Sequence, residues 1–96
     1  MEIKTICTVW IAEDHDTGEL ITATHKFEDL IDILCESHYI YDNFEVLDKN
    51  NKYAPIQEVL GSGWRDTLKR MSSRAIDKMF DWEVSLRQLD LKMVVR

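Results

Sequence analysis

The densest group of side chains that could do chemistry is acidic and spans residues 13–19, near the N-terminus. Its members are Glu13, Asp14, Asp16 and Glu19. Carboxylate oxygens are the ligands that Ca²⁺ and Mg²⁺ prefer, but an EF-hand needs alternating ligands, a central glycine and a closing bidentate glutamate. The segment Asp14-x-Asp16-x-Gly18 meets too few of these requirements. The sequence therefore predicts no metal site and no cofactor, and we interpret this segment as a solvated turn.

Within this turn, Asp16-Thr17-Gly18 spells the triplet of aspartic proteases. Protease chemistry needs two aspartates that share one proton in a site shielded from water. Here the triplet follows acidic residues instead of an apolar strand, so its carboxylate is predicted to stay exposed. Gly18 fits the positive-φ position of a turn. We therefore exclude protease chemistry as the function of the triplet.

The histidines and cysteines are scattered along the chain without catalytic or metal-binding spacing. They are His15, His25, His38, Cys7 and Cys35. A hydrolase needs a nucleophile, a histidine and an orienting acid close together, and no local signature of such a group is present. Both cysteines fall at core-facing positions of predicted elements, where a free thiol behaves as a small hydrophobe; one disulfide between them is the alternative. The sequence predicts that the protein is not an enzyme.

The charge of the chain is divided unevenly between its two halves. The whole chain has 18 acidic and 12 basic residues, a formal net charge of −6. Residues 1–48 contain 12 of the acids and only two lysines, a net charge of −10, whereas residues 49–96 have ten basic and six acidic side chains, a net charge of +4. An imbalance of this kind bears on partners rather than on fold. It predicts two surfaces of opposite charge.

The acidic half offers a face for a basic partner. Asp29, Asp32 and Glu36 recur along one side of a predicted helix, with Ile33 beside them as an apolar contact. Together with the acidic turn, the predicted partner-binding face consists of Glu13, Asp14, Asp16, Glu19, Asp29, Asp32, Ile33 and Glu36. A nucleic-acid mimic is the strongest version of this idea. However, the three carboxylates span ~10.5 Å of helix, a length in which B-DNA places about six charges, so the helix alone mimics a duplex poorly.

The basic half offers an alternative face on a helix predicted over residues 64–80. Its members are Arg65, Lys69, Arg70, Arg74 and Lys78. A basic stripe of this kind can neutralise phosphates. Apart from Trp64, which belongs to the apolar stripe, no aromatic residue is interleaved with these basic residues, and the net charge of −6 repels nucleic acid at long range. We interpret it as a solvated face with pairs such as Asp66–Arg70, and nucleic-acid binding is the alternative.

Apolar periodicity predicts a small α+β domain in the order ββαββαβ, an antiparallel or mixed sheet with two amphipathic helices packed on it. Strands are predicted over residues 3–11, 20–25, 44–47, 52–54 and within 83–95, and helices over residues 27–38 and 64–80. A second helix that runs on to residue 87 is the alternative. The alternation changes phase at Arg87-Gln88, which predicts a bulge or a helix-to-strand junction there. The length of 96 residues suits a single domain with one modest core.

We expect a non-enzymatic protein-binding module, a small acidic regulator or inhibitor that docks on a basic surface of a larger protein, such as one that processes nucleic acid. The hypothesis places it in a phage or mobile element. The alternative is a self-assembling structural protein, in which the acidic half of one chain meets the basic half of another. No apolar run is long enough for a membrane span and no signal-peptide pattern opens the chain, so a cytoplasmic protein without membrane contact is expected.

Overall fold

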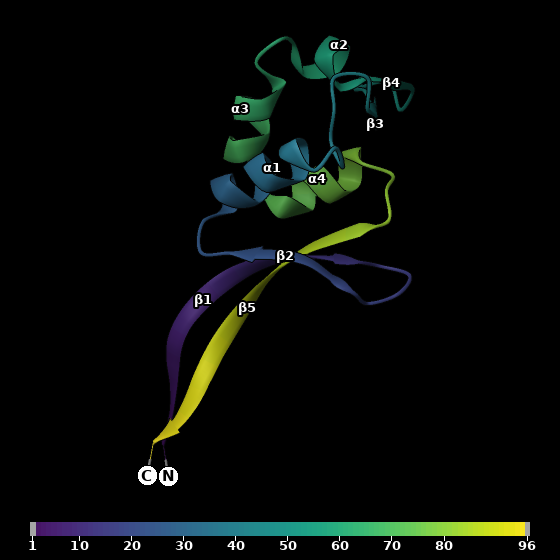
Figure 1. Cartoon of the computed structure of the whole chain (residues 1–96). Coiled ribbons are helices and arrows are strands. Elements are labelled where there is room, and N and C mark those ends of the chain that lie inside the picture. The colour runs from purple at the N-terminus through teal and green to yellow at the C-terminus, as the bar shows by residue number, and fades with distance from the viewer. Residues whose placement is uncertain (1, 96) are drawn as a thin grey trace.

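The computed structural model describes residues 2–95 and, within them, the side chains of residues 2–92. The protein is a small α+β fold in which helices cover one side of an antiparallel sheet (Figure 1). The strands are β1 (Glu2–Asp14), β2 (Leu20–Thr24), β3 (Glu45–Leu47), β4 (Tyr53–Pro55) and β5 (Val84–Val95). The helices are α1 (Phe27–Glu36), α2 (Ile56–Leu60), α3 (Trp64–Arg70) and α4 (Ser73–Met79). The α+β class is thus confirmed, whereas the predicted count of two helices is wrong, because the described residues form four.

Strand β1 is the centre of a three-stranded sheet with the order β2-β1-β5. Both neighbours run antiparallel to it, but β2 pairs only with residues 10–13, whereas β5 pairs with β1 from end to end. Residues 2–9 and 89–95 therefore form a two-stranded segment, here called the ribbon, which projects away from the helices (Figure 1). The ribbon gives the molecule its elongated extents of 54 × 27 × 25 Å.

The helix predicted over residues 64–80 is in fact two helices, α3 and α4, separated by Met71 and Ser72. Ser72 caps α4, because its hydroxyl accepts a hydrogen bond from the backbone N–H of Ala75 at 3.1 Å. Serine competes with the backbone inside a helix but stabilises a helix start. Leu68 in α3 and Ile76 in α4 are both fully buried. Because α4 ends at Met79 and β5 follows, a helix that extends to residue 87 is wrong.

The alternation of apolar residues changes phase at Arg87-Gln88, but there is neither a bulge nor a helix-to-strand junction there. Strand β5 pairs with β1 across these residues without a register shift. Val84 and Leu86 are buried, and α4 packs against β5. Since side chains alternate between the two faces of a strand, Leu89 and Leu91 project from the opposite face. The change of phase therefore marks the point where β5 leaves the core and enters the ribbon.

The core lies between the helices and the base of the sheet. Helix α1 buries Leu30, Ile31 and Leu34 completely, and each such side chain contributes roughly 1.5–3 kcal/mol through removal from water. Both cysteines are free and half-buried. Cys35 packs against the core, and burial raises the pKa of its thiol. Cys7 lies in the ribbon outside the core cluster, so the prediction that it faces the core is wrong.

Candidate functional site

Helix α1 ends in a hydrogen-bond pattern that redirects the following chain. The N–H of Tyr39 donates to the carbonyl of Leu34 at 2.9 Å, and the N–H of His38 donates to the carbonyl of Cys35 at 3.2 Å. This is a Schellman motif, which needs a left-handed residue just past the helix, and His38 takes that role with φ 61°. A left-handed conformation costs a non-glycine residue roughly 1–2 kcal/mol. His38 is thus exposed beyond the end of α1, so the helix predicted over residues 27–38 ends two residues earlier than expected.

Four aromatic rings pack together where this loop meets the segment between α4 and β5. Phe44 lies 5.6 Å from Tyr41, 5.0 Å from Phe80 and 5.8 Å from Trp82, measured between ring centroids. Phe80 and Trp82 lie 4.8 Å apart at 80°. Edge-to-face pairs of this geometry each add about 0.5–1.5 kcal/mol beyond burial. The cluster therefore forms one packed aromatic wall.

A pocket of about 350 Å³ opens beside this wall. It is lined by Asp14, His38, Tyr39, Tyr41, Phe44, Asp81, Trp82, Glu83 and Val84. Three of these residues carry carboxylates and four carry aromatic rings, in addition to the imidazole. None of the residues that line it, all within the described part of the chain, is a lysine or an arginine. The pocket therefore combines negative charge with exposed ring faces.

Two of the three carboxylates are held in place by hydrogen bonds. One oxygen of Asp14 accepts from the backbone N–H groups of Asp16 at 2.8 Å and Thr17 at 3.0 Å. Asp81 accepts from the phenol of Tyr53 at 3.0 Å, and this bond raises the pKa of Tyr53. The phenol thus stays protonated as a donor. Such fixed carboxylates offer their remaining acceptor sites to a ligand without further ordering.

The indole of Trp82 has an unused donor. Its Nε1 is buried and meets no hydrogen-bond acceptor among the described residues. An unsatisfied buried donor costs about 1–3 kcal/mol. Trp82 also borders a second hollow of about 210 Å³, which His15 and Asp77 help to line. Trp82 therefore lines both hollows, and its indole N–H signal is expected to respond to a ligand on either side.

The structure divides the predicted acidic face into two groups. In the first group, Asp14 lines the pocket, Asp16 and Glu19 are exposed in the turn, and Glu13 pairs with Arg87 at 2.8 Å. In the second group, on α1, only Asp29 is exposed without serving an internal ion pair in the described structure. Its other members are Asp32, Ile33 and Glu36. The two groups therefore have different surroundings.

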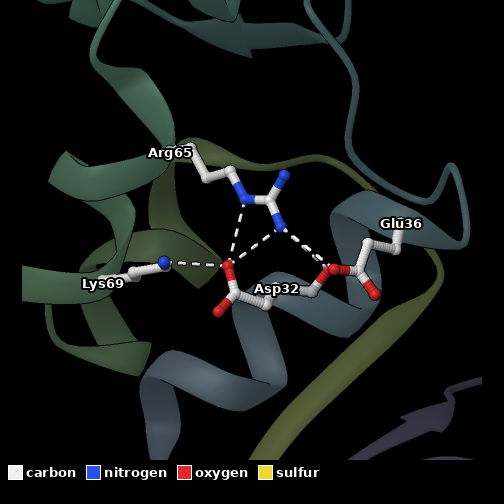
Figure 2. Close-up of polar contacts among 4 residues, drawn as sticks. All are labelled: Asp32, Glu36, Arg65 and Lys69. Atoms are coloured by element: carbon white, nitrogen blue, oxygen red, sulfur yellow. Dashed lines mark hydrogen bonds and ion pairs between the residues drawn. The ribbon is translucent and has the colours of Figure 1, made fainter.

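Asp32 and Glu36 of the second group face the basic helix α3 (Figure 2). Lys69 Nζ lies 2.8 Å and Arg65 Nη2 lies 2.9 Å from the same oxygen, Oδ1 of Asp32. Arg65 also approaches Glu36 at 3.6 Å. The hydrogen bond from Lys69, followed by that from Arg65, holds the pKa of Asp32 below its ordinary value, and the bond to Asp32 raises the pKa of each cation. The acidic and basic halves thus meet within one chain.

Replacing Asp32 with asparagine is expected to lower the free energy of unfolding by about 1 kcal/mol at pH 7. The expected loss of stability is small because Asp32, Arg65 and Lys69 are all partly exposed. Because folding lowers the pKa of Asp32 below 3.8, its contribution is present above that pH and is lost as pH falls through the folded value. Urea unfolding at pH 7 and pH 2 measures this, with the exposed Asp29→Asn as control. If the difference in unfolding free energy between the wild type and Asp32→Asn were the same at pH 2 as at pH 7, this expectation would be wrong.

The predicted basic face is divided by the break at Ser72. Arg65 and Lys69 project from α3 toward Asp32, whereas Arg70 at the end of α3 is exposed. Arg74 and Lys78 are exposed on α4, a separate helix. The continuous stripe that the prediction placed on one helix is therefore wrong in its geometry.

Other features of the described residues offer less chemistry. A larger hollow of about 430 Å³ mixes Lys49 with Asp48 and Glu58 and has no aromatic ring in its lining. In the part of the chain that the structure describes, no three His, Cys, Asp or Glu side chains are grouped to hold a metal ion. None of the four described helices is long and apolar enough to cross a bilayer. The aromatic, acidic pocket is therefore the strongest candidate site.

Apart from Asp14, the residues that line this pocket were not predicted from the sequence as site residues. Residues 27–48 contain seven acids and neither lysine nor arginine, and three aromatic residues fall within residues 39–44. Asp81-Trp82-Glu83 repeats the same acidic and aromatic composition in the second half. This composition was the available signal, but only the fold brings the two segments to one place.

Three comparisons add no family to this description. No protein-family model, no curated protein and no solved structure matches the chain. The function has to be argued from the site itself.

Proposed function

We propose that the protein is a non-catalytic binding module, a small acidic regulator or inhibitor that holds a basic segment of a larger protein in the pocket beside Trp82. The observation that carries the proposal is the lining of the pocket: three carboxylates and four aromatic rings, without lysine or arginine among them. Carboxylates beside aromatic ring faces are the side chains that hold a cationic group, so recognition of such a group fits this lining.

A lysine or arginine side chain is the ligand that such a lining favours. Charge-assisted hydrogen bonds to Asp81 and Glu83 would hold its cationic group. A cation over a tyrosine or tryptophan face gains about 0.5–1 kcal/mol at an exposed site and more when water is removed. Tyr39 and Tyr41, which are 40% and 50% exposed, present rings at the mouth of the pocket. The cation thus meets charge and ring faces at once.

The acidic turn beside the pocket supports the same proposal. Asp14 belongs to both the turn and the pocket lining, and Asp16 and Glu19 are exposed next to it. Exposed charges of one sign steer an oppositely charged partner and raise the association rate more than they lower the dissociation rate. On α1, Asp32 and Glu36 form ion pairs with α3. The proposed binding face is therefore centred on the turn and the pocket rather than on α1.

A titration followed by NMR tests the proposal. The probe is an acetylated and amidated hexapeptide of alternating arginine and lysine, with a hexaglutamate peptide as control. The chain has three tryptophans, and the indole signal of Trp82, assigned through Trp82→Phe, is expected to move on addition of the basic peptide only. The Trp64 indole, which donates to Asp42 at 2.9 Å, is expected to stay in place.

Two variants with equal loss of charge sharpen this test. Asp81→Asn with Glu83→Gln is expected to weaken binding of the basic peptide by about tenfold at low salt. Glu58→Gln with Asp66→Asn removes the same charge from α2 and α3 and is expected to leave binding nearly unchanged. Equal weakening by the two variants, or a Trp82 signal that does not move, would show that the pocket is not the binding site.

A further inference from the structure

The ribbon leaves two strand edges open. Within the described residues, nothing pairs with the outer edge of β5, and β2 reaches only residues 10–13 of β1, so residues 2–9 are also unpaired on one side. A two-stranded segment by itself is at best marginally stable in water. Unpaired backbone N–H and C=O groups at such an edge form a template for another strand.

The two open edges differ in how well they could accept a strand. On β1, the register shift between Thr5 and Cys7 leaves Ile6 as an extra residue, and such a bulge interrupts pairing. Strand β5 has 12 residues, no proline and no extra residue opposite β1. The regular edge of β5 is therefore the one able to pair.

Side chains next to the β5 edge also lack cover. Leu89 is 37% and Leu91 is 43% exposed, and Ile6 on the neighbouring strand is 61% exposed. The face of the ribbon that carries the two leucines lies opposite to the face that continues under the helices. An apolar row beside an open edge is typical of a surface that another sheet extends.

The order of charged residues along β5 favours a second copy of the same strand as the partner, and it favours one register of the pair. Consider two copies of β5 that pair antiparallel about a two-fold axis. Directly opposite residues project from the same face of the sheet. They are therefore either the same residue in both copies or residues an even number of positions apart. With Leu91 on the axis, Asp90 lies opposite Lys92 of the second copy, and this pairing occurs twice. A shift of the axis to Asp90 or to Lys92 would place like charges opposite each other, which is unfavourable.

We propose that a second copy of this chain pairs antiparallel along β5, with Leu91 on the two-fold axis, to form a continuous six-stranded sheet. The pairing covers residues 87–95 of each copy and forms about eight to ten backbone hydrogen bonds. The two Leu91 side chains cover each other. Asp90 is already oriented, because Thr8 donates to its carboxylate at 2.8 Å. The helices stay clear of the contact, since the ribbon projects away from them (Figure 1).

Sedimentation velocity over a range of protein concentrations tests the proposal on the full chain. The wild type is expected to dimerise. Lys92→Asp places two acids opposite each other twice, and Asp90→Lys does the same with two lysines, so each is expected to raise the dissociation constant about thirtyfold. Lys49→Asp changes the charge equally in the exposed β3–β4 turn and is expected to have no effect.

A mixture of the two single variants provides the decisive result. Lys92→Asp mixed with Asp90→Lys restores both opposite-charge pairs, so a mixed dimer is expected where neither variant dimerises alone. Thermal unfolding of each variant confirms that it is folded. The proposal would be overturned if the wild type stayed monomeric at every concentration or if the mixture did not associate. It would also be overturned if Lys49→Asp weakened the dimer as much as Lys92→Asp does. The outcome is independent of peptide binding at the pocket.

Discussion

Replacement of Phe80 by alanine is expected to lower the free energy of unfolding by about 3–4 kcal/mol. Phe80 is only 5% exposed, and its ring contacts those of Phe44 and Trp82 at 5.0 and 4.8 Å between centroids. Its backbone also bridges to Val46 in β3. Truncation therefore leaves a cavity between α4 and the loop that carries the pocket. For a chain of this size the melting temperature should fall by roughly 15–25 °C.

Phe80→Leu is the matched control, because it keeps an apolar side chain of similar volume and is expected to lose no more than about 1.5 kcal/mol. Urea unfolding followed by tryptophan fluorescence gives both values. The near-ultraviolet circular dichroism of the aromatic cluster should weaken in Phe80→Ala even below its unfolding transition. If both variants lost the same small amount, the ring of Phe80 would not be part of a packed cluster.

Local apolar spacing was enough to predict the elements that bury one continuous face. Helix α1 follows from the recurrence of Leu30, Ile31 and Leu34 at helical spacing, and β1 follows from simple alternation. The ion pair between α1 and α3 follows from no such pattern. Asp32 and Lys69 are 37 positions apart, and only the packing of α1 on α3 brings them to 2.8 Å. The uneven charge of the two halves was visible in the sequence, but the internal use of that charge was not.

The wrong and missed predictions share a physical cause, because tertiary packing overrides a locally consistent pattern of apolar residues. Trp64, Leu68, Met71, Ala75 and Met79 fit one helical stripe, yet the chain breaks at Met71 and Ser72, where Ser72 caps a second helix. The buried residue of that second helix is Ile76, which lies outside the predicted stripe. Similarly, the pocket joins Asp14, Tyr39 and Asp81 from three separated segments. Composition indicated acidic and aromatic segments, but no spacing rule relates residues so far apart.

The two leucines on either side of the phase change in β5 should respond very differently to truncation. Leu86 lies opposite Ala12, is 5% exposed and belongs to the core, whereas Leu89 lies opposite Val9 in the ribbon and is 37% exposed. Leu86→Ala is expected to lower the free energy of unfolding by about 3 kcal/mol, equivalent to roughly 15–20 °C in melting temperature. Leu89→Ala is expected to lower it by less than about 1 kcal/mol.

Each leucine thus serves as the control for the other, since the substitution and the strand are the same and only the face differs. Urea unfolding at low protein concentration keeps any association through β5 out of the measurement. A bulge at Arg87-Gln88 would have placed both leucines on the core face and made the two losses similar. Because the pairing with β1 has no shift there, alternation alone puts them on opposite faces. Equal losses would therefore contradict the register of β5, and with it the placement of Leu89 and Leu91 beside an open edge.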